Sequence, residues 1–448
     1  MDAHRQQIAV VGSGVAGLSC AWLLARRHAV TLFEAAPRLG GHVNTIAVDA
    51  PGGPVPVDTG FIVYNEKTYP NLTALFRHLS VETQASEMSF AVSLDDGALE
   101  YAGTDLGGLF AQKRNLLRPR FWRMLADLLR FYRAAPRDLA ALGDGDETLG
   151  AYLDRNGYGA ALRDDHLLPM AAAVWSGGTA ALAEYPAASF IRFCANHGLL
   201  QITDRPQWRT VTGGSAEYVR KLLADFPGTI EAGQPIHAVR RLGDGVELRT
   251  GAGEVRRFDQ VVLATSAPRA LEMLADADAT ELALLGPFGA TRNLAVLHSD
   301  PALMPKRRAV WASWNYIGAR APKPGAELCV TYWMNRLQTI PGARPFFVTL
   351  NPPRPPAAGT LWHSEIYEHP LFSPAAIAAQ RRLWALQGTR RTWFCGAWFG
   401  AGFHEDGLQA GLAVAEQLGG VARPWTVAAP SGRIHVAPAP AEPAWSAA

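Results

Sequence analysis

The sequence has little cysteine, no marked excess of charge and no long apolar run, and each shortage excludes a class of protein. Its four cysteines are scattered over 448 residues without a C-x-x-C pair, which excludes a disulfide framework and predicts reduced thiols. The net charge of +2 gives no general attraction for nucleic acid. No apolar segment is long enough to span a bilayer, and three glycines interrupt the apolar N-terminal segment, unlike a signal peptide. We therefore expect a cytoplasmic protein without a nucleic-acid partner, and no residue pattern indicates a metal site.

One stretch near the start, residues 8–42, organises the rest of the chain. The apolar run at 8–11 predicts a buried parallel strand, and Gly-Ser-Gly-Val-Ala-Gly follows it directly. These glycines permit a tight turn, close approach of the backbone to a pyrophosphate, and close packing of a helix expected at 15–27. Glu34 ends the next strand, where a ribose hydroxyl needs an acceptor, so a mere structural turn does not explain the pattern. The residues assigned to a dinucleotide are Gly12, Gly14, Val15, Ala16, Gly17, Glu34 and Ala35.

The segment after Glu34 distinguishes a nicotinamide from a flavin cofactor. Its sequence, Arg38-Leu39-Gly40-Gly41-His42, resembles the R-x-G-G element of the flavin amine-oxidase superfamily. In that superfamily the arginine and the glycine backbone reach the FAD pyrophosphate and the rim of the isoalloxazine. A glycine pair does let backbone approach a large planar ligand, and a cation suits its phosphates. The resemblance therefore implies FAD.

Three later segments continue the resemblance, which covers most of residues 8–418. The stretch at 58–64 resembles the D-x-G segment that passes the flavin, with an ordinary turn residue as the alternative for Asp58. The strand and turn at 261–268 resemble those that end beside the flavin, and Ile236 matches a position whose backbone contacts the adenine side. The stretch at 392–418 resembles the C-terminal signature, whose helix dipole faces a flavin edge that becomes anionic on reduction. The cofactor contacts implied are Arg38, Gly40, Gly41, His42, Thr59, Gly60, Phe61, Ile236, Ala264, Thr265, Gly396, Asp406, Gly407 and Leu408.

The resemblance implies an α/β fold in which a Rossmann-type FAD-binding domain carries an inserted α+β substrate domain. The FAD-binding domain is expected at residues 1–66, 206–270 and 386–420, and the substrate domain at residues 67–205, which should be helical, and 271–385. The tail at 421–448 is rich in alanine and proline and is expected to be disordered. No cysteine matches the covalent-attachment position of monoamine oxidases, so the flavin should be held noncovalently.

Within the superfamily, the sequence resembles a bacterial group of predicted NAD/FAD-binding proteins. Genes of that group often lie beside cyclopropane-fatty-acid-synthase-like genes, which implies an unsaturated or methyl-branched acyl substrate by association alone. The sequence departs from true amine oxidases, in which a lysine holds a water near flavin N5, because Asn293 takes that place. Trp398 and Phe399 stand where the paired tyrosines of an amine cage would be. The marks of the group are Met88-Ser89-Phe90, Asn293-x4-His298-x-Asp300, Trp311-x2-Trp314-Asn315-Tyr316 and Gly402-Phe403-His404-Glu405-Asp406-Gly407.

The favoured hypothesis is an FAD-dependent oxidoreductase of the desaturase or isomerase type, which moves hydride between an apolar fatty-acyl substrate and flavin N5. A base is needed where a C–H proton also leaves, and His404 and Glu405 are the candidates because their loop should face the flavin. His404 could instead fix that loop by a hydrogen bond, and His42 is a weaker candidate. Asn293 is the third candidate catalytic residue. The alternatives are an amine oxidase with a rearranged cage and a non-redox binding protein on the same fold.

An amphipathic helix is predicted over residues 121–132, with apolar side chains on one face. This pattern is typical of a core helix with a solvated basic face, and also of a helix that lies on an anionic membrane surface. In the second case the protein would sit at the inner face of the membrane, near an acyl substrate. The basic residues around the helix, against Asp127 alone, are Lys113, Arg114, Arg118, Arg120, Arg123, Arg130, Arg133 and Arg137.

Overall fold

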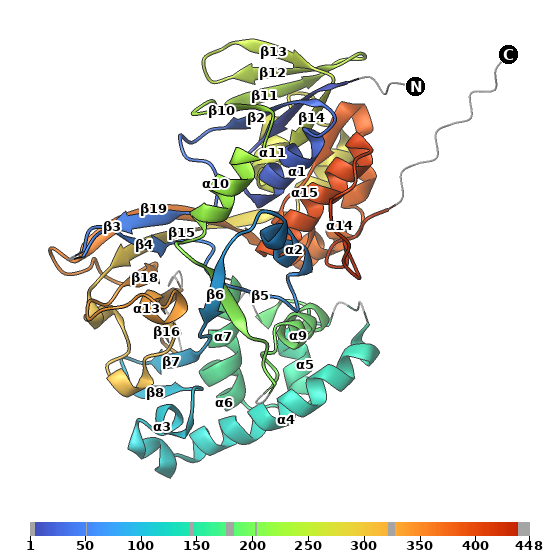
Figure 1. Ribbon diagram of the computed structural model, residues 1–448. Helices are drawn as coiled ribbons and strands as arrows, with labels where there is room; N and C mark the ends of the chain where they lie inside the picture. The colour runs from blue at the N-terminus through green and yellow to red at the C-terminus, as the bar shows by residue number, and fades with distance from the viewer. Residues whose placement is uncertain are drawn as a thin grey trace. The chain divides into compact units, whose positions relative to one another are not determined.

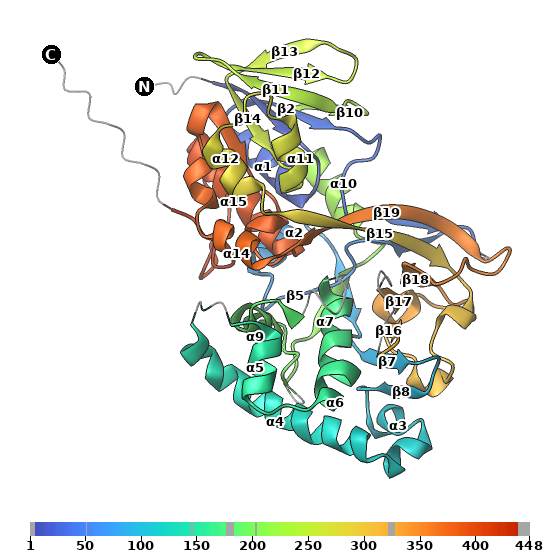
Figure 2. The ribbon, with the colours of Figure 1, turned by 180° about the vertical axis from the view of Figure 1, so that it is seen from behind.

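The computed structural model describes residues 5–50, 52–143, 145, 147–175, 183–201, 204–320 and 328–437. They form two compact units, each assembled from separate stretches of the chain. The first unit comprises Met1–Gly41, Leu222–Phe288 and Ala375–Ala448, and the second comprises His42–Lys221 and Gly289–Pro374. Figures 1 and 2 show the elements of both units from opposite sides.

The first unit is built on a parallel sheet with the strand order β10-β2-β1-β14-β20. Its central strands are short apolar runs with buried side chains, as a sheet covered on both faces requires. Because the strands run parallel, their carboxyl ends lie at one edge of the sheet, which is where α/β proteins bind ligands. The strands are β10 (Thr229–Ala232), β2 (Ala29–Glu34), β1 (Gln7–Val11), β14 (Gln260–Leu263) and β20 (Thr392–Phe394).

Two helices from opposite ends of the chain pack together on this sheet. They are α1 (Val15–Leu24) and α15 (His404–Gly419), which lie side by side in both views, one blue and one red. A Cβ on Gly411 would overlap with the carbonyl oxygen of Ala16, so this close approach requires glycine. The unit also contains an antiparallel sheet of β11 (Ile236–Arg241), β12 (Val246–Thr250) and β13 (Val255–Phe258), with α11 (Ala267–Met273), α12 (Ala279–Leu285) and α14 (Pro374–Gln380).

The second unit contains a larger sheet with the strand order β19-β15-β18-β17-β16-β7-β8. All neighbours in it are antiparallel except β16 and β7. Two smaller sheets pair β3 with β4 and β9 with β5 and β6. The strands are β19 (Leu361–Leu371), β15 (Gly289–His298), β18 (Phe347–Leu350), β17 (Cys329–Trp333), β16 (Trp314–Gly318), β7 (Phe90–Leu94), β8 (Leu99–Ala102), β3 (Thr45–Val48), β4 (Val55–Asp58), β9 (Trp208–Val211), β5 (Tyr64–Asn65) and β6 (Thr83–Ser86).

The helical part of the second unit includes the predicted amphipathic helix. This helix, α4 (Pro119–Leu142), is longer than predicted and buries Phe121, Met124 and Phe131, while Tyr132 is only half-buried. Within the range 67–205, which the sequence analysis expects to be helical, residues 163–167 form a π-helical turn that continues directly into a further helix, and residues 176–182 lie outside the described part of the chain. Within the described ranges, no helix has the length and apolar character needed to cross a membrane. The other α-helices of the described residues in this unit are α2 (Pro70–His78), α3 (Leu106–Leu109), α5 (Leu149–Arg155), α6 (Ala160–Leu162), α7 (Leu168–Trp175), α9 (Ala187–Asn196), α13 (Met334–Leu337) and α10 (Ala216–Ala224), the last of which crosses the boundary between the units.

The boundaries of the units differ from those expected at residues 66, 205, 270 and 385. The second unit already begins at His42 and continues to Lys221, because β9 near residue 210 pairs with β5 and β6. Residues 271–288 stay with the first unit, which resumes at Ala375. Pairings between strands more than 100 residues apart decide these boundaries, and local sequence patterns carry no signal for them.

The segment at 421–437 packs against the first unit, which corrects the expectation of a disordered tail. Arg433 Nε donates to the buried carboxylate of Asp406 at 2.6 Å. Trp425 stacks on Trp22 with ring centroids 6.0 Å apart, and Arg423 pairs with Glu416 at 2.6 Å. The segment is rich in alanine and proline, which favours disorder, but these few side chains hold it against the rest of the unit. Residues 438–448 lie outside the described part of the chain.

Replacing Arg433 with alanine is expected to destabilise the protein by about 3 kcal/mol, because a buried carboxylate loses its cation. Urea unfolding followed by circular dichroism measures the change. Arg269→Ala, which removes an exposed pair with Glu272, is the control and should cost under about 1 kcal/mol. Equal losses in the two variants would mean that the segment around Arg433 does not anchor on the first unit.

Candidate functional site

The turn after β1 has a shape that requires glycine at two positions and leaves open space at a third. Gly12 has a φ of +103°, and a Cβ on it would lie 2.7 Å from the carbonyl oxygen of Ala264. A Cβ on Gly17 would overlap with the carbonyl oxygen of Gly12. Gly14 differs, because its φ is −62° and a Cβ there would meet no atom within 4 Å. The backbone at the start of α1 is therefore accessible beside Gly14.

The N-terminus of α1 is available to a ligand and is bordered by the loop of Arg38, Gly40 and Gly41. No side chain caps this helix, so the N–H groups of its first turn and its positive dipole end can bind an anion. Gly40 N donates to Ser13 at 3.1 Å, and a Cβ on Gly41 would lie 3.0 Å from Gly14 Cα. Arg38 donates to the carbonyl of Gly41 at 3.0 Å, which holds the loop closed.

The carboxylate of Glu34 is oriented by the same turn. It accepts hydrogen bonds from Ser13 N at 2.8 Å, Ser13 Oγ at 2.6 Å and Ala36 N at 3.0 Å. Ser13 is fully buried, and the sequence analysis did not single it out. Two of the bonds go to one oxygen and one to the other, so the second oxygen keeps acceptor capacity for a ribose hydroxyl.

The other predicted residues of the first unit follow the carboxyl ends of neighbouring strands. Ala264 N donates to the carbonyl of Val11 at 2.8 Å, directly before Gly12. Trp398 is buried and donates to the carbonyl of Thr265 at 3.0 Å, so it belongs to the packing of the unit. The structure thus brings to one sheet edge Gly12, Gly14, Glu34, Ala264, Thr265 and, after β20, Gly396. Ile236 begins β11 two residues after Gln234, whose N–H donates to the carbonyl of Glu34 at 2.9 Å.

At the start of α15, residues that the sequence analysis predicted to contact the cofactor also make contacts within the protein. The helix begins at His404, and Asp406 accepts the N–H of Phe403 at 2.8 Å and pairs with Arg433. Burial raises the pKa of Asp406, and Arg433 opposes that shift. The side chain of Asp406 is therefore a helix cap and an ion-pair partner. Glu405 is buried and bonded to Gln409 at 2.9 Å, so its catalytic assignment stays a prediction.

Close packing explains the other two residues predicted there. A Cβ on Gly407 would lie 2.9 Å from Val15 Cγ1, so glycine lets the first turn of α15 approach the first turn of α1. Leu408 is fully buried and fills the core of the first unit. His404 is half-buried at the first position of the helix.

In the second unit, residues 42–44 run beside residues 59–61. Phe61 N donates to the carbonyl of His42 at 2.8 Å, and Thr59 N donates to that of Asn44 at 2.9 Å. A Cβ on Gly60 would overlap with the carbonyl oxygen of His42, so this approach requires glycine. The predicted residues His42, Thr59, Gly60 and Phe61 are therefore neighbours.

Asp58 has a structural role, which favours the alternative considered for it. Its carboxylate is fully buried and accepts hydrogen bonds from Ser215 N and Oγ, from Thr45 Oγ1 and from Gln338 Nε2. Burial raises the pKa of Asp58 to about 6, while the bonds from Thr45 and Ser215 act in the opposite direction. Asp58 thereby joins three distant segments of the second unit.

Asn293, on β15, lies in a chain of hydrogen bonds that ends at a histidine of β19. Leu294 N donates to Asn351 Oδ1 and Asn351 Nδ2 to Asn293 Oδ1, both at 2.8 Å. Asn293 Nδ2 then lies 2.9 Å from His369 Nδ1. Burial, together with the neighbouring His42, lowers the pKa of His369 to about 3. His369 is therefore neutral at physiological pH, with Nδ1 as the acceptor.

The same face of β19 carries a tyrosine and a carboxylate. Tyr367 OH lies 2.7 Å from Thr59 Oγ1 and accepts from Asn44 Nδ2 at 3.0 Å. Asn44 Nδ2 also donates to Glu365. The ring of His42 stacks on Tyr367 with centroids 5.2 Å apart, and lies 5.3 Å from that of His369. We call this set the polar cluster: His42, Asn44, Thr59, Asn293, Glu365, Tyr367 and His369.

The sequence analysis predicted three of these residues and missed four: Asn44, Glu365, Tyr367 and His369. A signal for three of the missed residues is present, because His363, Glu365, Tyr367 and His369 alternate along one strand. Such spacing puts all of them on one face of a sheet. The register of β19 with β15 sets Tyr367 opposite Asn293, which no local pattern could show.

The family model described as flavin containing amine oxidoreductase matches residues 15–306. The chain belongs to the flavin-containing amine oxidoreductase family. It is an FAD-dependent oxidoreductase with the α/β fold that the sequence predicted.

Relatives of this flavin amine oxidoreductase differ in what they act on. A putrescine oxidase mutant has 13% identity and a TM-score of 0.66, over 92% of this chain and 98% of that one. The CLA-producing fatty acid isomerase from P. acnes has 17% identity and a TM-score of 0.65, over 92% and 97%. Carotenoid phi-ring synthase from Chlorobaculum tepidum is 36% identical over 97 residues, which are 21% of this chain and 15% of that protein. The solved structures share the fold of this chain.

The residues of the first unit fit FAD. The open backbone at Gly14 and the uncapped start of α1 would take the pyrophosphate, with Arg38 as the nearby cation. Glu34, oriented by Ser13, would accept a ribose hydroxyl. When bound, FAD supplies a hydride acceptor.

Proposed function

We propose that this oxidoreductase moves hydride between an unsaturated or methyl-branched fatty-acyl substrate and its flavin, so that a double bond is created or moved. The observation that carries the proposal is the environment of Asn293. Where the resemblance puts the lysine of amine oxidases, the chain has a neutral amide bonded on both sides, to Asn351 and His369. A fatty acid isomerase and a carotenoid ring synthase among the relatives support an apolar substrate.

The neutrality of His369 suits an apolar substrate. Its Nδ1 is turned toward the amide of Asn293, so the ring proton is on Nε2. The low pKa of His369, about 3, keeps this ring uncharged above that pH. Asn293 and His369 would thereby face an acyl chain as neutral groups.

His42 is our candidate for the group that takes the substrate proton. It follows Gly41 of the FAD loop directly in the chain, and its ring is exposed and stacked on Tyr367. In a desaturation, one carbon loses hydride, the adjacent carbon loses a proton to the imidazole, and a C=C bond forms between them. His404, at the start of α15, is the second candidate.

Amine oxidation is the second candidate function, and Glu365 is the observation that favours it. Its carboxylate lies beside Asn44 and His363, with 32% of the side chain exposed. A carboxylate in this position could hold an ammonium group. The putrescine oxidase among the solved structures acts on such a substrate by name.

Anaerobic mixing of the holoenzyme with each substrate class tests the proposal. Phospholipids with unsaturated or methyl-branched acyl chains are expected to bleach the oxidised flavin band, whereas mono- and diamines should leave it unchanged. Glu365→Gln should keep the reaction with lipids, because the proposal gives this carboxylate no role with an apolar substrate. Bleaching by an amine that disappears in Glu365→Gln would establish amine oxidation instead.

A further inference from the structure

The second unit exposes an apolar patch that is formed by residues just before α4 and by one residue in its first turn. Leu106 and Leu117 are the most exposed large hydrophobic residues of the described chain, at 74% and 87%. Leu116 and Trp122 are 48% and 47% exposed. These four residues, the apolar patch, belong to α3 (Leu106–Leu109), η1 (Lys113–Leu117) and the start of α4, which lie together in Figures 1 and 2. Single exposed apolar residues are ordinary, but a group of them indicates an interaction surface.

The patch is held at the surface by defined contacts. The ring of Phe110 packs on Trp122 with centroids 5.6 Å apart, and Trp122 Nε1 donates to the carbonyl of Leu116 at 2.9 Å. The buried side chain of Asn115 donates to the carbonyl of Glu100 at 3.0 Å. The exposed apolar side chains are therefore part of the fold, and binding would remove them from water.

The charge around the patch is mainly positive. Residues 105–126 contain five basic residues and one acidic residue, Asp105, which caps α3. Lys113 and Arg123 are exposed, while Arg120 pairs with the buried Asp165 at 2.8 Å. Burial and the charges of neighbouring guanidinium groups lower the pKa of Arg118, as expected where cations crowd together. This surface should attract anions.

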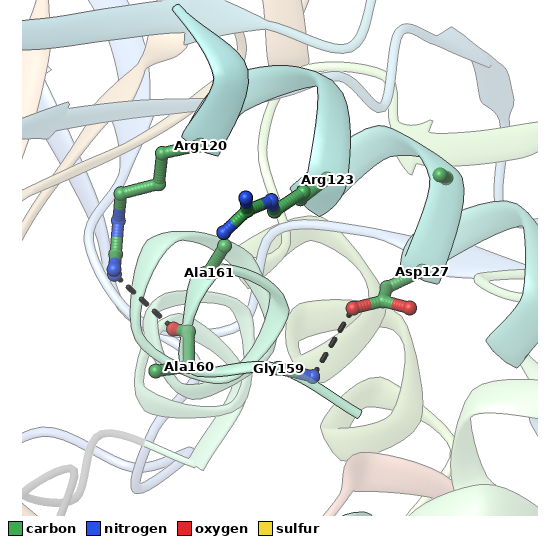
Figure 3. Close-up of a pocket in the computed structure, with 7 residues that line it drawn as sticks. Arg120, Arg123, Asp127, Gly159, Ala160 and Ala161 are labelled. Carbon is green, nitrogen blue, oxygen red and sulfur yellow. Dashed lines mark hydrogen bonds between the residues drawn. The ribbon is translucent and has the colours of Figure 1, made fainter. Parts of the chain in front are cut away.

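The helix that carries Trp122 also borders a pocket (Figure 3). Its volume is about 480 Å³, and it is lined by Arg120, Arg123, Ala126 and Asp127 of α4 together with the turn at 159–161. Arg120 donates to the carbonyl of Ala160 at 3.2 Å. Arg123 reaches into the pocket in Figure 3, and Asp127 accepts the N–H of Gly159 at 3.1 Å on the other side.

We propose that this surface docks on an anionic phospholipid bilayer. The apolar patch would enter the interface between headgroups and acyl chains, and Lys113 and Arg123 would face the phosphates. Pairing with a second copy through the same face would set like charges against one another, which disfavours a symmetric dimer. The docking goes beyond the proposed function, since it does not depend on which substrate reduces the flavin.

Sedimentation with vesicles of phosphatidylcholine, with an increasing share of phosphatidylglycerol, tests the docking on the holoenzyme. Wild type should bind the anionic vesicles, and salt should weaken the binding. Lys113→Glu with Arg123→Glu should weaken it more than tenfold, since each cation near such a surface contributes roughly fivefold. Leu117→Ser should weaken it at all salt concentrations, because an exposed leucine contributes apolar contact without charge.

Arg137→Glu is the matched control, because Arg137 is also exposed on α4 but lies 14 residues beyond Arg123, about 20 Å along the helix. Arg120 and Arg130 are unsuitable, since Arg120 pairs with Asp165 and Arg130 donates to the carbonyls of residues 156 and 157. Flavin absorbance and thermal unfolding check that each variant is folded.

Three outcomes would overturn the docking. They are absence of wild-type binding, equal binding to vesicles without phosphatidylglycerol, and an equal loss in Arg137→Glu. Self-association that Leu117→Ser abolishes, without vesicle binding, would assign the patch to a second copy instead. Flavin bleaching by detergent-dispersed lipid in a protein that does not bind vesicles would overturn the docking and leave the proposed function intact. Vesicle binding without flavin bleaching by any lipid would overturn the proposed function and leave the docking intact.

Discussion

Replacing Gly14 with glutamate is expected to yield a folded protein that purifies without FAD. A side chain fits at this position, because the φ of −62° is ordinary and a Cβ would meet no protein atom within 4 Å. Its carboxylate would enter the space assigned to the pyrophosphate at the uncapped start of α1. Placing like charges together there costs several kcal/mol, so FAD affinity should fall more than about a hundredfold.

The measurement is the ratio of flavin to protein absorbance, followed by FAD titration of the apoprotein. Gly243→Glu is the matched control, because Gly243 lies between β11 and β12 in the same unit and a Cβ there also meets nothing within 4 Å. Its FAD content should equal that of wild type. Full occupancy in Gly14→Glu would contradict the placement of the pyrophosphate.

Replacing His42 with alanine is expected to slow flavin reduction by the acyl substrate about a hundredfold or more, with FAD retained. A fall in rate of this size is what the loss of a general base is expected to cause. FAD should stay because Phe61 N donates to the backbone carbonyl of His42, which the substitution keeps.

Stopped-flow reduction under anaerobic conditions measures the rate, and the flavin absorbance of the purified variant measures its FAD content. His404→Ala serves as the comparison, and its rate should stay within several-fold of wild type. A large loss in His404→Ala, with little change in His42→Ala, would move the base to the start of α15.

The sequence could predict residues for the FAD side of the site because the signal there is local. Strand, glycine turn, helix and acidic residue follow one another within about 30 residues, and each performs a separable physical task. The structure adds Ser13, whose hydroxyl orients Glu34 from within the same turn. It also shows that the side chain of Asp406 contacts Phe403 N at the start of α15 and Arg433, while the prediction of a cofactor contact there stays a prediction.

The polar cluster could not be predicted, since long-range strand register assembles it. Asn44 and Glu365 are hydrogen-bonded although they are 321 residues apart. Tyr367 faces Asn293 only because β19 pairs with β15 in one particular register. The alternation of polar residues along residues 363–369 indicated a shared face, but nothing in the sequence showed what that face would meet.

The proposed chemistry is tested most directly by the fate of an acyl chain in a single anaerobic turnover. The holoenzyme is mixed with a slight excess of phospholipid that carries a methyl-branched, unsaturated chain, and the recovered chains are analysed by mass spectrometry while flavin absorbance is followed. We predict one chain that has lost two hydrogens for each flavin reduced, or a chain of unchanged mass with a moved double bond and a flavin that returns to the oxidised form. Unaltered chains beside an oxidised flavin, together with aldehyde formation and flavin reduction in a parallel mixture with an amine, would contradict it.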